Sequence, residues 1–279
     1  MPAGPFARAV YSRVAGSRAL RRPLGAIRSH PRVRAFARRH VQVLLARGTT
    51  WANVDGALRL LAEDPRQQIV FGPWEGDATA ELLYWAPFVR WAQEHFSLEP
   101  ARITVVSRGG VGHWYGGACG TYAETLDDGV DAAVFSPGPV LALVEEYRSG
   151  RAAPRPLLKR ARHMPLPPPP APNGLPDAYV AVGAECPVQL SGSVVTIDET
   201  QPPGAQHAFL ARATGLLAGW SGLALLGVLS GVPTIALRPA GGEVCEPDLD
   251  VAVRVAAELG TSLNIVDAAA LEGLENALR

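Results

Sequence analysis

The sequence predicts an α/β protein with two doubly wound parallel-sheet domains. Along most of the 279 residues, apolar runs of strand length alternate with stretches of helical periodicity. This alternation is typical of parallel sheets with helices on both faces. It is interrupted once, by "MPLPPPPAPNGLP" at residues 164–176, which contains seven prolines. Because a single core seldom serves a chain much longer than this one, we expect two domains, with one large domain as the alternative.

In the first half of the chain, three apolar runs are expected to form strands: 67–73, 101–107 and 131–137. Residues 77–96 are expected to form a helix, because their apolar side chains recur every three or four positions. Pro87 should kink this helix, since proline has no backbone N–H to donate. A further helix is expected at 138–149.

The same alternation resumes after the proline-rich segment. Five strands are expected, at 178–182, 193–198, 215–218, 233–237 and 262–267. Four helices are expected between and after them, near 204–213, 222–230, 248–259 and 268–278. Only ten residues separate the first two of these strands, which is too few for the usual crossover and helix. A part of this second domain is therefore expected to be missing.

These segments define four parts of the chain. Residues 1–54 form an arginine-rich helical arm, and residues 55–150 form the first α/β domain. Residues 151–176 are a linker whose prolines favour an extended conformation that advances about 3.1 Å per residue. Residues 177–279 form the second α/β domain, which is shortened.

The arm differs from the rest of the chain in charge. Residues 1–54 hold eleven arginines and no acid, whereas the remainder carries 15 basic and 26 acidic residues, a net charge of −11. Apolar residues between the arginines of 33–45 predict a helix that lies on an anionic membrane surface. The alternatives are an arm that folds onto its own acidic body and a partly disordered arm. Without a recognition motif, the arginines indicate only non-specific attraction to nucleic acid.

Composition also limits the class of protein. No apolar run approaches the about 18 residues that span a bilayer, and no secretory signal precedes the arm, so the cytoplasm is the expected location. The widely spaced Cys119, Cys186 and Cys245 argue against a disulfide framework and against a zinc site. We expect neither a metal nor a cofactor.

The first candidate site is "FGPWEGDATAELLYW", residues 71–85, where a strand passes into a helix. Its glycines, Gly76 among them, allow a tight turn, and Asp77 is well placed to cap the helix that follows. A carboxylate of Asp77 or Glu75 beside Trp74 is suited to act as a general base toward a sugar hydroxyl, while the indole stacks on the sugar. The alternative is a capped helix with a buried tryptophan.

The second candidate site is "SRGGVGHWY", residues 107–115, directly after the next strand. Glycines beside Arg108 are able to form a loop that binds an anion, with the guanidinium as a fork of donors. The alternative for Arg108 is a salt bridge to a neighbouring acid. His113 is either a surface hydrogen-bonding group or a catalyst. The nucleotide fingerprint GxGxxG and the P-loop ending are both absent.

The third candidate site lies in "LLAGWSGLALLGVLSGVPTIAL", residues 216–237. A strand, a Gly-Trp-Ser-Gly turn, a helix and a second strand form a βαβ unit. Its turn presents the backbone N–H groups of Ser221 and Gly222 at the helix start, where a diphosphate would be favourable. Gly231 and Pro233 also fit a simple helix stop and strand entry.

Taken together, the three motifs resemble bacterial glycosyltransferases of the GT-B fold, including members associated with surface polysaccharide synthesis. The resemblance covers about residues 65–279 and implies two Rossmann-like domains that face a cleft. It implies that the first domain receives the acceptor through Trp74, Gly76, Asp77, Arg108 and Trp114. It implies that the second domain holds the nucleotide-sugar donor through Trp220, Ser221, Gly222 and Arg238. Many inverting members of this class use a carboxylate base and no metal.

The chain departs from the related pattern at three positions. Asp77 and Thr79 stand where Glu and Gly are usual, and Ser221 stands where a second Gly is usual. The expected function is transfer of a sugar from a nucleotide-sugar to a glycan or lipid-linked acceptor by single displacement, with Asp77, or else Glu75, as the base. The alternative is a degenerate protein of the same fold that binds or acts as a scaffold without catalysis.

Overall fold

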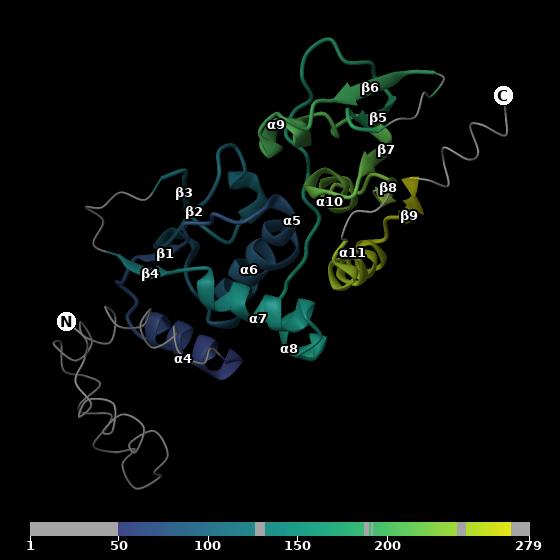
Figure 1. Ribbon diagram of the computed structural model, residues 1–279. Helices are drawn as coiled ribbons and strands as arrows, with labels where there is room; N and C mark the ends of the chain where they lie inside the picture. The colour runs from purple at the N-terminus through teal and green to yellow at the C-terminus, as the bar shows by residue number, and fades with distance from the viewer. Residues whose placement is uncertain (1–49, 126–131, 187–189, 191, 239–243, 269–279) are drawn as a thin grey trace, which may run out of the picture. The chain divides into compact units, whose positions relative to one another are not determined.

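The computed structural model describes residues 50–125, 132–186, 190, 192–238 and 244–268 (Figure 1). Nearly all of the 1–54 arm, and all but the first residue of the helix expected at 268–278, lie outside these residues. Both sheets belong to one compact unit, residues 45–279. None of the described helices combines the length and the apolar character needed to cross a membrane. The expected α/β class with two parallel sheets is confirmed.

The first sheet has four parallel strands in the order β3-β2-β1-β4. The strands are β1 (Ile69–Phe71), β2 (Ile103–Val106), β3 (Thr121–Ala123) and β4 (Ala133–Phe135). Three of them lie within the runs expected from the sequence. The fourth, β3, was not expected, because its three residues are partly exposed and form no apolar run.

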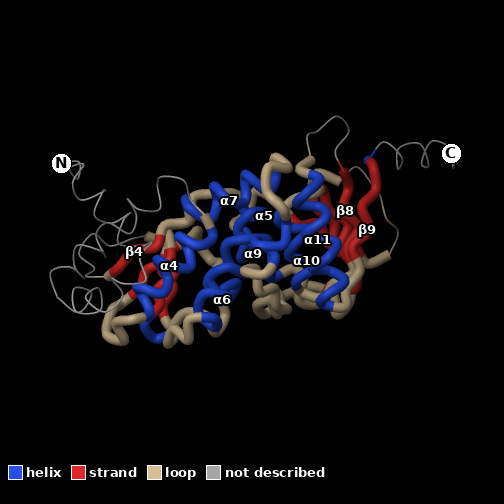
Figure 2. The backbone as a smooth tube through the Cα atoms, turned by 90° about the horizontal axis from the view of Figure 1, so that it is seen from below, coloured by secondary structure: helices blue, strands red, loops and turns tan. Residues whose placement is uncertain are grey.

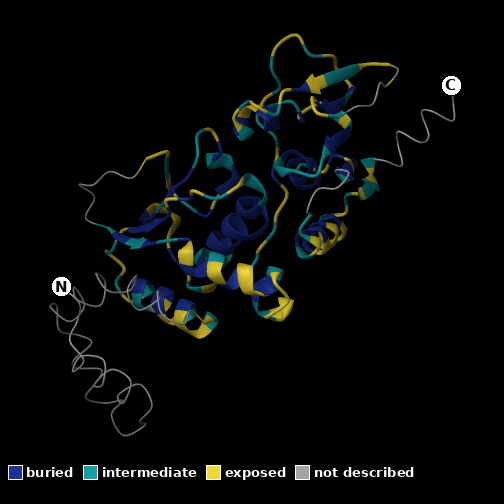
Figure 3. Cartoon of the chain, in the orientation of Figure 1, coloured by how far each residue is buried: buried dark blue, intermediate teal, exposed yellow. Residues whose placement is uncertain are grey.

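The helix expected at 77–96 is present as three pieces. They are α5 (Ala78–Ala80), a π-helical turn η2 (Glu81–Trp85) and α6 (Ala86–His95). Figure 3 shows the central part of this stretch as buried, and residues 80–90 are buried without interruption. Pro87 has no N–H for the carbonyl of Leu83, four residues earlier, and the Nε2 atom of His163 lies 3.0 Å from that oxygen instead. A residue of the linker thus satisfies the group that the proline leaves unpaired.

Other helices surround the first sheet. They are α4 (Trp51–Ala62), α7 (Gly138–Arg148), α8 (Pro154–Leu158) and the short 3₁₀ turns η3 (Pro100–Arg102) and η4 (Gly112–Tyr115). The core between sheet and helices is aromatic: Phe71 and Phe135 from the strands pack against Trp85 and Phe88 from η2 and α6. The helix α7 agrees with the expected 138–149 segment, and residues 164–176, all described, form neither helix nor strand.

The second sheet has five parallel strands in the order β6-β5-β7-β8-β9. The strands are β5 (Tyr179–Gly183), β6 (Val194–Ile197), β7 (Ala213–Gly219), β8 (Thr234–Arg238) and β9 (Leu263–Asp267). Each coincides with an expected strand to within a few residues. Three helices accompany them: α9 (Pro203–Ala208), α10 (Gly222–Leu229) and α11 (Glu246–Leu259).

The strand order explains where these helices lie. The connections from β6 to β7, β7 to β8 and β8 to β9 all step in one direction across the sheet, so right-handed crossovers place α9, α10 and α11 on one face. Figure 2 shows these helices on the same side of β8 and β9. The connection from β5 to β6 steps the other way, and its described residues hold no helix. As far as the chain is described, the second sheet thus has helices on one face, where the sequence led us to expect both.

A buried ion pair joins the two sheet-bearing parts. Asp248 in the first turn of α11 is 4% exposed. It accepts hydrogen bonds from Arg148 Nε at 2.9 Å and Nη2 at 2.6 Å, and from the Tyr84 hydroxyl at 2.6 Å. The bidentate geometry and the third donor compensate the cost of burying the carboxylate.

We predict that Arg148→Met destabilises the fold by about 3 kcal/mol, because the Asp248 carboxylate would keep only the Tyr84 hydroxyl as partner. The measurement is urea unfolding followed by circular dichroism. The control is Arg254→Met, which removes an exposed ion pair with Glu258 and should cost less than about 0.5 kcal/mol. Equal losses in the two variants would contradict the prediction.

Candidate functional site

The structure brings the first and third predicted sites into contact. A Cβ atom added to Gly222 would lie 2.8 Å from the Cβ of Ala78, so the start of α10 touches the start of α5. Both starts are capped by the predicted residues: Asp77 accepts from the backbone N–H of Ala80 at 2.7 Å, and the Ser221 hydroxyl accepts from that of Leu223 at 3.2 Å. We use the name seam for this contact together with the neighbouring contacts of residues 110 and 113 with residues 204 and 207.

The turn on the first side of the seam is built around Trp74. Its indole is 5% exposed, stacks on Trp85 at 5.9 Å between ring centroids, and donates through Nε1 to the carbonyl of Asp77 at 3.3 Å. Gly76 fits only without a side chain, because its Cβ would lie 2.6 Å from the indole. The buried indole presents little surface for a sugar ring. The carboxylates of Glu75 and Asp77, in contrast, belong to exposed residues.

The second predicted site is held to this turn by a buried carboxylate. Glu81 in η2 is 0% exposed and accepts from Arg108 Nε at 2.8 Å and from the Tyr115 hydroxyl at 2.5 Å. Ser107 also donates to it, and the other arm of Arg108 donates to the carbonyl of Gly76. The structure therefore shows Arg108 in the ion pair that was one of its two expected roles, and that pair joins the 107–115 loop to the turn.

Burial of Glu81 raises the pKa of its carboxyl, while hydrogen bonds from Ser107 and Tyr115 and the charge of Arg108 act in the opposite direction. Burial beside Glu81 likewise raises the pKa of the Tyr115 phenol. The only sign of this cluster in the sequence is one acid among the apolar residues of "ELLYW". A buried position for that acid requires donors from elsewhere in the chain.

Trp114, the remaining predicted acceptor residue, is fully buried, and its indole N–H has no hydrogen-bond partner. It lies in η4 and contributes its backbone carbonyl to Arg90 at 2.9 Å. The structure thus places Trp114 in the core beneath the loop. Its role toward an acceptor stays a prediction.

The other side of the seam contains a carboxylate that the sequence did not single out. Ser221 donates to Glu199 Oε2 at 3.3 Å, and Glu199 Oε1 is buried without a hydrogen-bond partner. This oxygen lies where the Cβ of a side chain at residue 183 would be, so a larger residue than Gly183 would displace the Glu199 carboxylate. Burial and the neighbouring Glu185 raise the pKa of Glu199. In the sequence, the only indication that Glu199 belongs to a site is its position two residues after β6, because acids at the carboxyl ends of strands often face ligands.

The two remaining predicted donor residues lie near the same edge of the second sheet. Trp220 is half-buried and donates its backbone N–H to the carbonyl of Leu237 at 2.9 Å. Arg238 forms ion pairs with Glu246 at 2.8 Å and with Asp267 at 3.5 Å. Its charge is thus already offset by two carboxylates.

A histidine pair crosses the seam beside these groups. His113 Nε2 lies 2.5 Å from His207 Nδ1, and His207 Nε2 lies 2.8 Å from the Ser230 hydroxyl. Because Ser230 donates its proton to the carbonyl of Leu226, its oxygen accepts from His207. His207 Nδ1 is then free to accept from His113, and both imidazoles are neutral. A second proton on His207 would place two donors against each other.

We predict that acid weakens this fold through His207. Burial and the neighbouring His113 lower the pKa of His207 from 6.5 to about 4, so between these values the unfolded chain binds more protons than the folded one. The stabilisation is complete above about pH 6.5 and is lost as the pH falls toward 4, by about 3 kcal/mol in total.

The measurement is urea unfolding at several pH values between 4 and 7, for the unchanged chain and for His207→Gln. The variant should show a shallower slope. Some dependence should remain, because burial also lowers the pKa of His163 to about 4. Identical slopes would contradict the assignment to His207.

Backbone atoms also meet across the seam at a pair of glycines. A Cβ added to Gly204 in α9 would overlap the carbonyl oxygen of Gly110. We predict that Gly204→Ala destabilises the fold by about 1–3 kcal/mol, because rigid backbone must shift to make room. The control is Gly56→Ala in α4, where nothing lies within 4 Å of the added atom and a gain of up to about 1 kcal/mol is expected. Calorimetric melting distinguishes the two variants. An unchanged melting temperature for Gly204→Ala would show that the backbones at Gly204 and Gly110 do not lie this close.

In the described part of the chain, no set of three or more His, Cys, Asp or Glu side chains is arranged to hold a metal ion. Cys119, Cys186 and Cys245 are half-buried free thiols.

Comparison with known proteins gives distant similarity to solved structures. Neither a family model nor a curated protein matches the chain. Among solved structures, the dodecameric iron-containing heptosyltransferase TibC, in complex with ADP-D-beta-D-heptose, matches with a TM-score of 0.41 and 14% sequence identity. The match covers 62% of this chain and 58% of the TibC chain.

Proposed function

We propose that the protein is a GT-B-type glycosyltransferase that moves a sugar from a nucleotide-sugar to a glycan or lipid-linked acceptor. The observation that carries the proposal is the contact of Ala78 with Gly222. It joins the turn proposed to receive the acceptor with the helix start proposed to hold the donor. Both lie at carboxyl ends of parallel strands, where α/β proteins bind their ligands.

In the proposed reaction, Asp77 removes the proton of an acceptor hydroxyl, with Glu75 as the alternative base. The acceptor oxygen forms a bond to the anomeric carbon of the sugar as the bond from that carbon to the diphosphate breaks. The leaving diphosphate takes up the negative charge. Backbone N–H groups at Ser221 and Gly222, together with Arg238, stabilise that charge.

This proposal requires movement at the seam. The starts of α5 and α10 touch, so a sugar between them needs the two sheet-bearing parts to separate locally. The residues proposed to bind it, Trp74 and Arg108 on one side and Trp220 on the other, would line the opened gap. Binding energy from the nucleotide would drive the separation.

A second candidate function is a non-catalytic binding or scaffold protein of the same fold. It is favoured by the pairing of both proposed ligand-binding arginines, Arg108 with Glu81 and Arg238 with Glu246 and Asp267. It is also favoured by the burial of Trp74. A diphosphate would have to compete with carboxylates for each of these cations.

The proposed setting follows from the arginine-rich arm. Residues 1–54 would attach the protein peripherally to the inner, anionic membrane surface in the cytoplasm, where surface polysaccharides are assembled from nucleotide-sugars. This part of the proposal rests on the sequence, because the arm lies almost entirely outside the described residues.

We predict that a nucleotide-sugar raises the melting temperature of the full chain and that Asp77→Asn abolishes transfer. A ligand at 100 times its dissociation constant adds about 2.7 kcal/mol of stability. Loss of a general base lowers turnover by about 10²–10⁴-fold. The measurements are a thermal-shift screen with UDP-, GDP-, ADP- and CMP-sugars and a transfer assay with the donor that responds.

The controls separate catalysis from folding. Asparagine caps helices as well as aspartate, so Asp77→Asn should keep the cap on Ala80 and the melting temperature. Glu75→Gln changes the neighbouring carboxylate and should keep transfer. Full activity of Asp77→Asn would rule out Asp77 as the base. An unchanged melting temperature with every nucleotide-sugar would favour the non-catalytic scaffold protein.

A further inference from the structure

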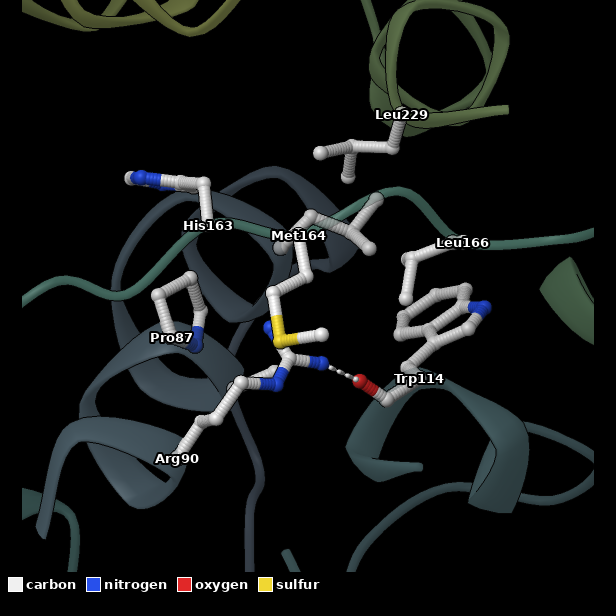
Figure 4. A pocket seen from close by; sticks show the side chains of 9 residues that line it. Pro87, Arg90, Trp114, His163, Met164, Leu166 and Leu229 are labelled. Atoms are coloured by element: carbon white, nitrogen blue, oxygen red, sulfur yellow. Dashed lines mark hydrogen bonds between the residues drawn. The ribbon is translucent and has the colours of Figure 1, made fainter. Parts of the chain in front are cut away.

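A small pocket lies where the linker crosses the helices of the first sheet (Figure 4). It is lined by α6 through Ala86, Pro87 and Arg90, by Trp114 of η4 and by the end of α10 through Leu229. Residues 163–166 of the linker form its remaining side, together with Leu82 of η2. The pocket shares Trp114 with the residues predicted to receive the acceptor, but none of its other lining residues belongs to the sites proposed for the sugar and its donor.

Arg90 is the charged residue of this pocket, and it is 4% exposed. Its Nη1 donates to the carbonyl of Arg162 and its Nη2 to that of Trp114, both at 2.9 Å; Figure 4 shows the second bond. The Nε atom is buried and has no hydrogen-bond partner. None of the described carboxylates forms a salt bridge with Arg90.

A guanidinium in this position is costly for the fold. Burial lowers the pKa of Arg90, but arginine does not lose its proton in proteins, so the charge stays. The two carbonyl acceptors satisfy N–H groups without cancelling the charge. Buried charges in native proteins are normally paired, and the nearby Glu94 is instead 3.5 Å from the exposed Arg162.

The walls of the pocket favour an anion over other partners. None of its nine lining residues is acidic, and seven of them are apolar. The second polar residue, His163, is neutral near pH 7, because burial lowers its pKa to about 4. Among the lining residues, an anion beside Arg90 would therefore meet one opposite charge and no like charge. The charges of Glu94 and Arg162, which also act on Arg90, lie outside the lining.

The pocket has room for about one water-sized particle. We propose that it binds a small, weakly hydrated monovalent anion, of which chloride is the representative, against the Arg90 guanidinium. A water molecule would satisfy Nε but would leave the charge uncompensated. Apolar walls further favour an anion that gives up its hydration readily.

Binding there would affect how the linker is held. Arg90 fixes the carbonyl of Arg162, and the backbone N–H of Leu166 donates to the carbonyl of Leu229 at 2.7 Å. The anion would thus sit among three segments, α6, the linker and the end of α10. It would stabilise their junction.

The test is chloride NMR line broadening with the full chain, with and without bromide as competitor. We expect excess broadening that bromide removes and that Arg90→Met abolishes. The matched control is Arg162→Met, which removes a neighbouring arginine that is 63% exposed and should keep the broadening. Unchanged broadening in Arg90→Met, or none in the unchanged chain, would overturn the proposal.

A second variant covers the case in which Arg90→Met fails to fold. Ala86→Leu keeps the guanidinium but fills part of the pocket, and it should also abolish the broadening. A thermal shift in bromide against gluconate at fixed ionic strength provides an independent readout. Bromide should raise the melting temperature of the unchanged chain and of Arg162→Met alone, and equal responses from all variants would count against the site.

Discussion

The close approach of backbone to backbone at the seam is the constraint on which the rest of the site depends. Gly222 against Ala78 and Gly204 against Gly110 leave no space for a side chain, so the two sheet-bearing parts meet within van der Waals distance. Such contact aligns polar groups that are far apart in sequence. The imidazoles of His113 and His207 meet beside these contacts, and the ion pair of Asp248 with Arg148 is a further contact between the two parts.

The polar groups near the seam are arranged to hold segments in place. Glu81 accepts hydrogen bonds from Ser107, Arg108 and Tyr115, and these bonds fix the 107–115 loop. Arg108 also donates a hydrogen bond to the carbonyl of Gly76. The exposed carboxylates of Asp77 and Glu75 therefore belong to a turn that these buried hydrogen bonds hold in place. A rigid support of this kind is what a general base requires, because a displacement of about 1 Å is enough to reduce catalysis strongly. It equally suits a scaffold, and ligand binding decides between the two.

Local pattern was enough to predict most of the strands and the cap at Asp77. The runs around Ile69, Ile103 and Val134 are apolar whatever surrounds them, and Asp77 precedes its helix in the usual capping position. Ser221 was expected only to present its backbone N–H, and the structure shows its hydroxyl as the cap of α10. The π-turn and β3 could not be predicted, because both depend on partners outside the segment. Burial of Trp74 was one of the two expectations for its turn, and the structure shows it. The pairing of Arg238 was not predicted, because local pattern identifies a cation that is able to bind a ligand but not the carboxylates that the fold brings to it.

Glu199 shows how the shortened second sheet bears on the proposed chemistry. In the order β6-β5-β7, the connections leave β5 and β7 in opposite directions, so the crevice between their carboxyl ends is the position at which open α/β sheets bind ligands. Ser221 at that crevice donates to Glu199, whose other oxygen has no partner. An ionised Glu199 would repel a diphosphate at the start of α10, and burial together with Glu185 raises the pKa of this carboxyl, which shifts it toward the neutral form. A protonated Glu199 would donate a hydrogen bond to the incoming group, so the proposed donor site depends on the protonation of this carboxyl as much as on the N–H groups of the helix.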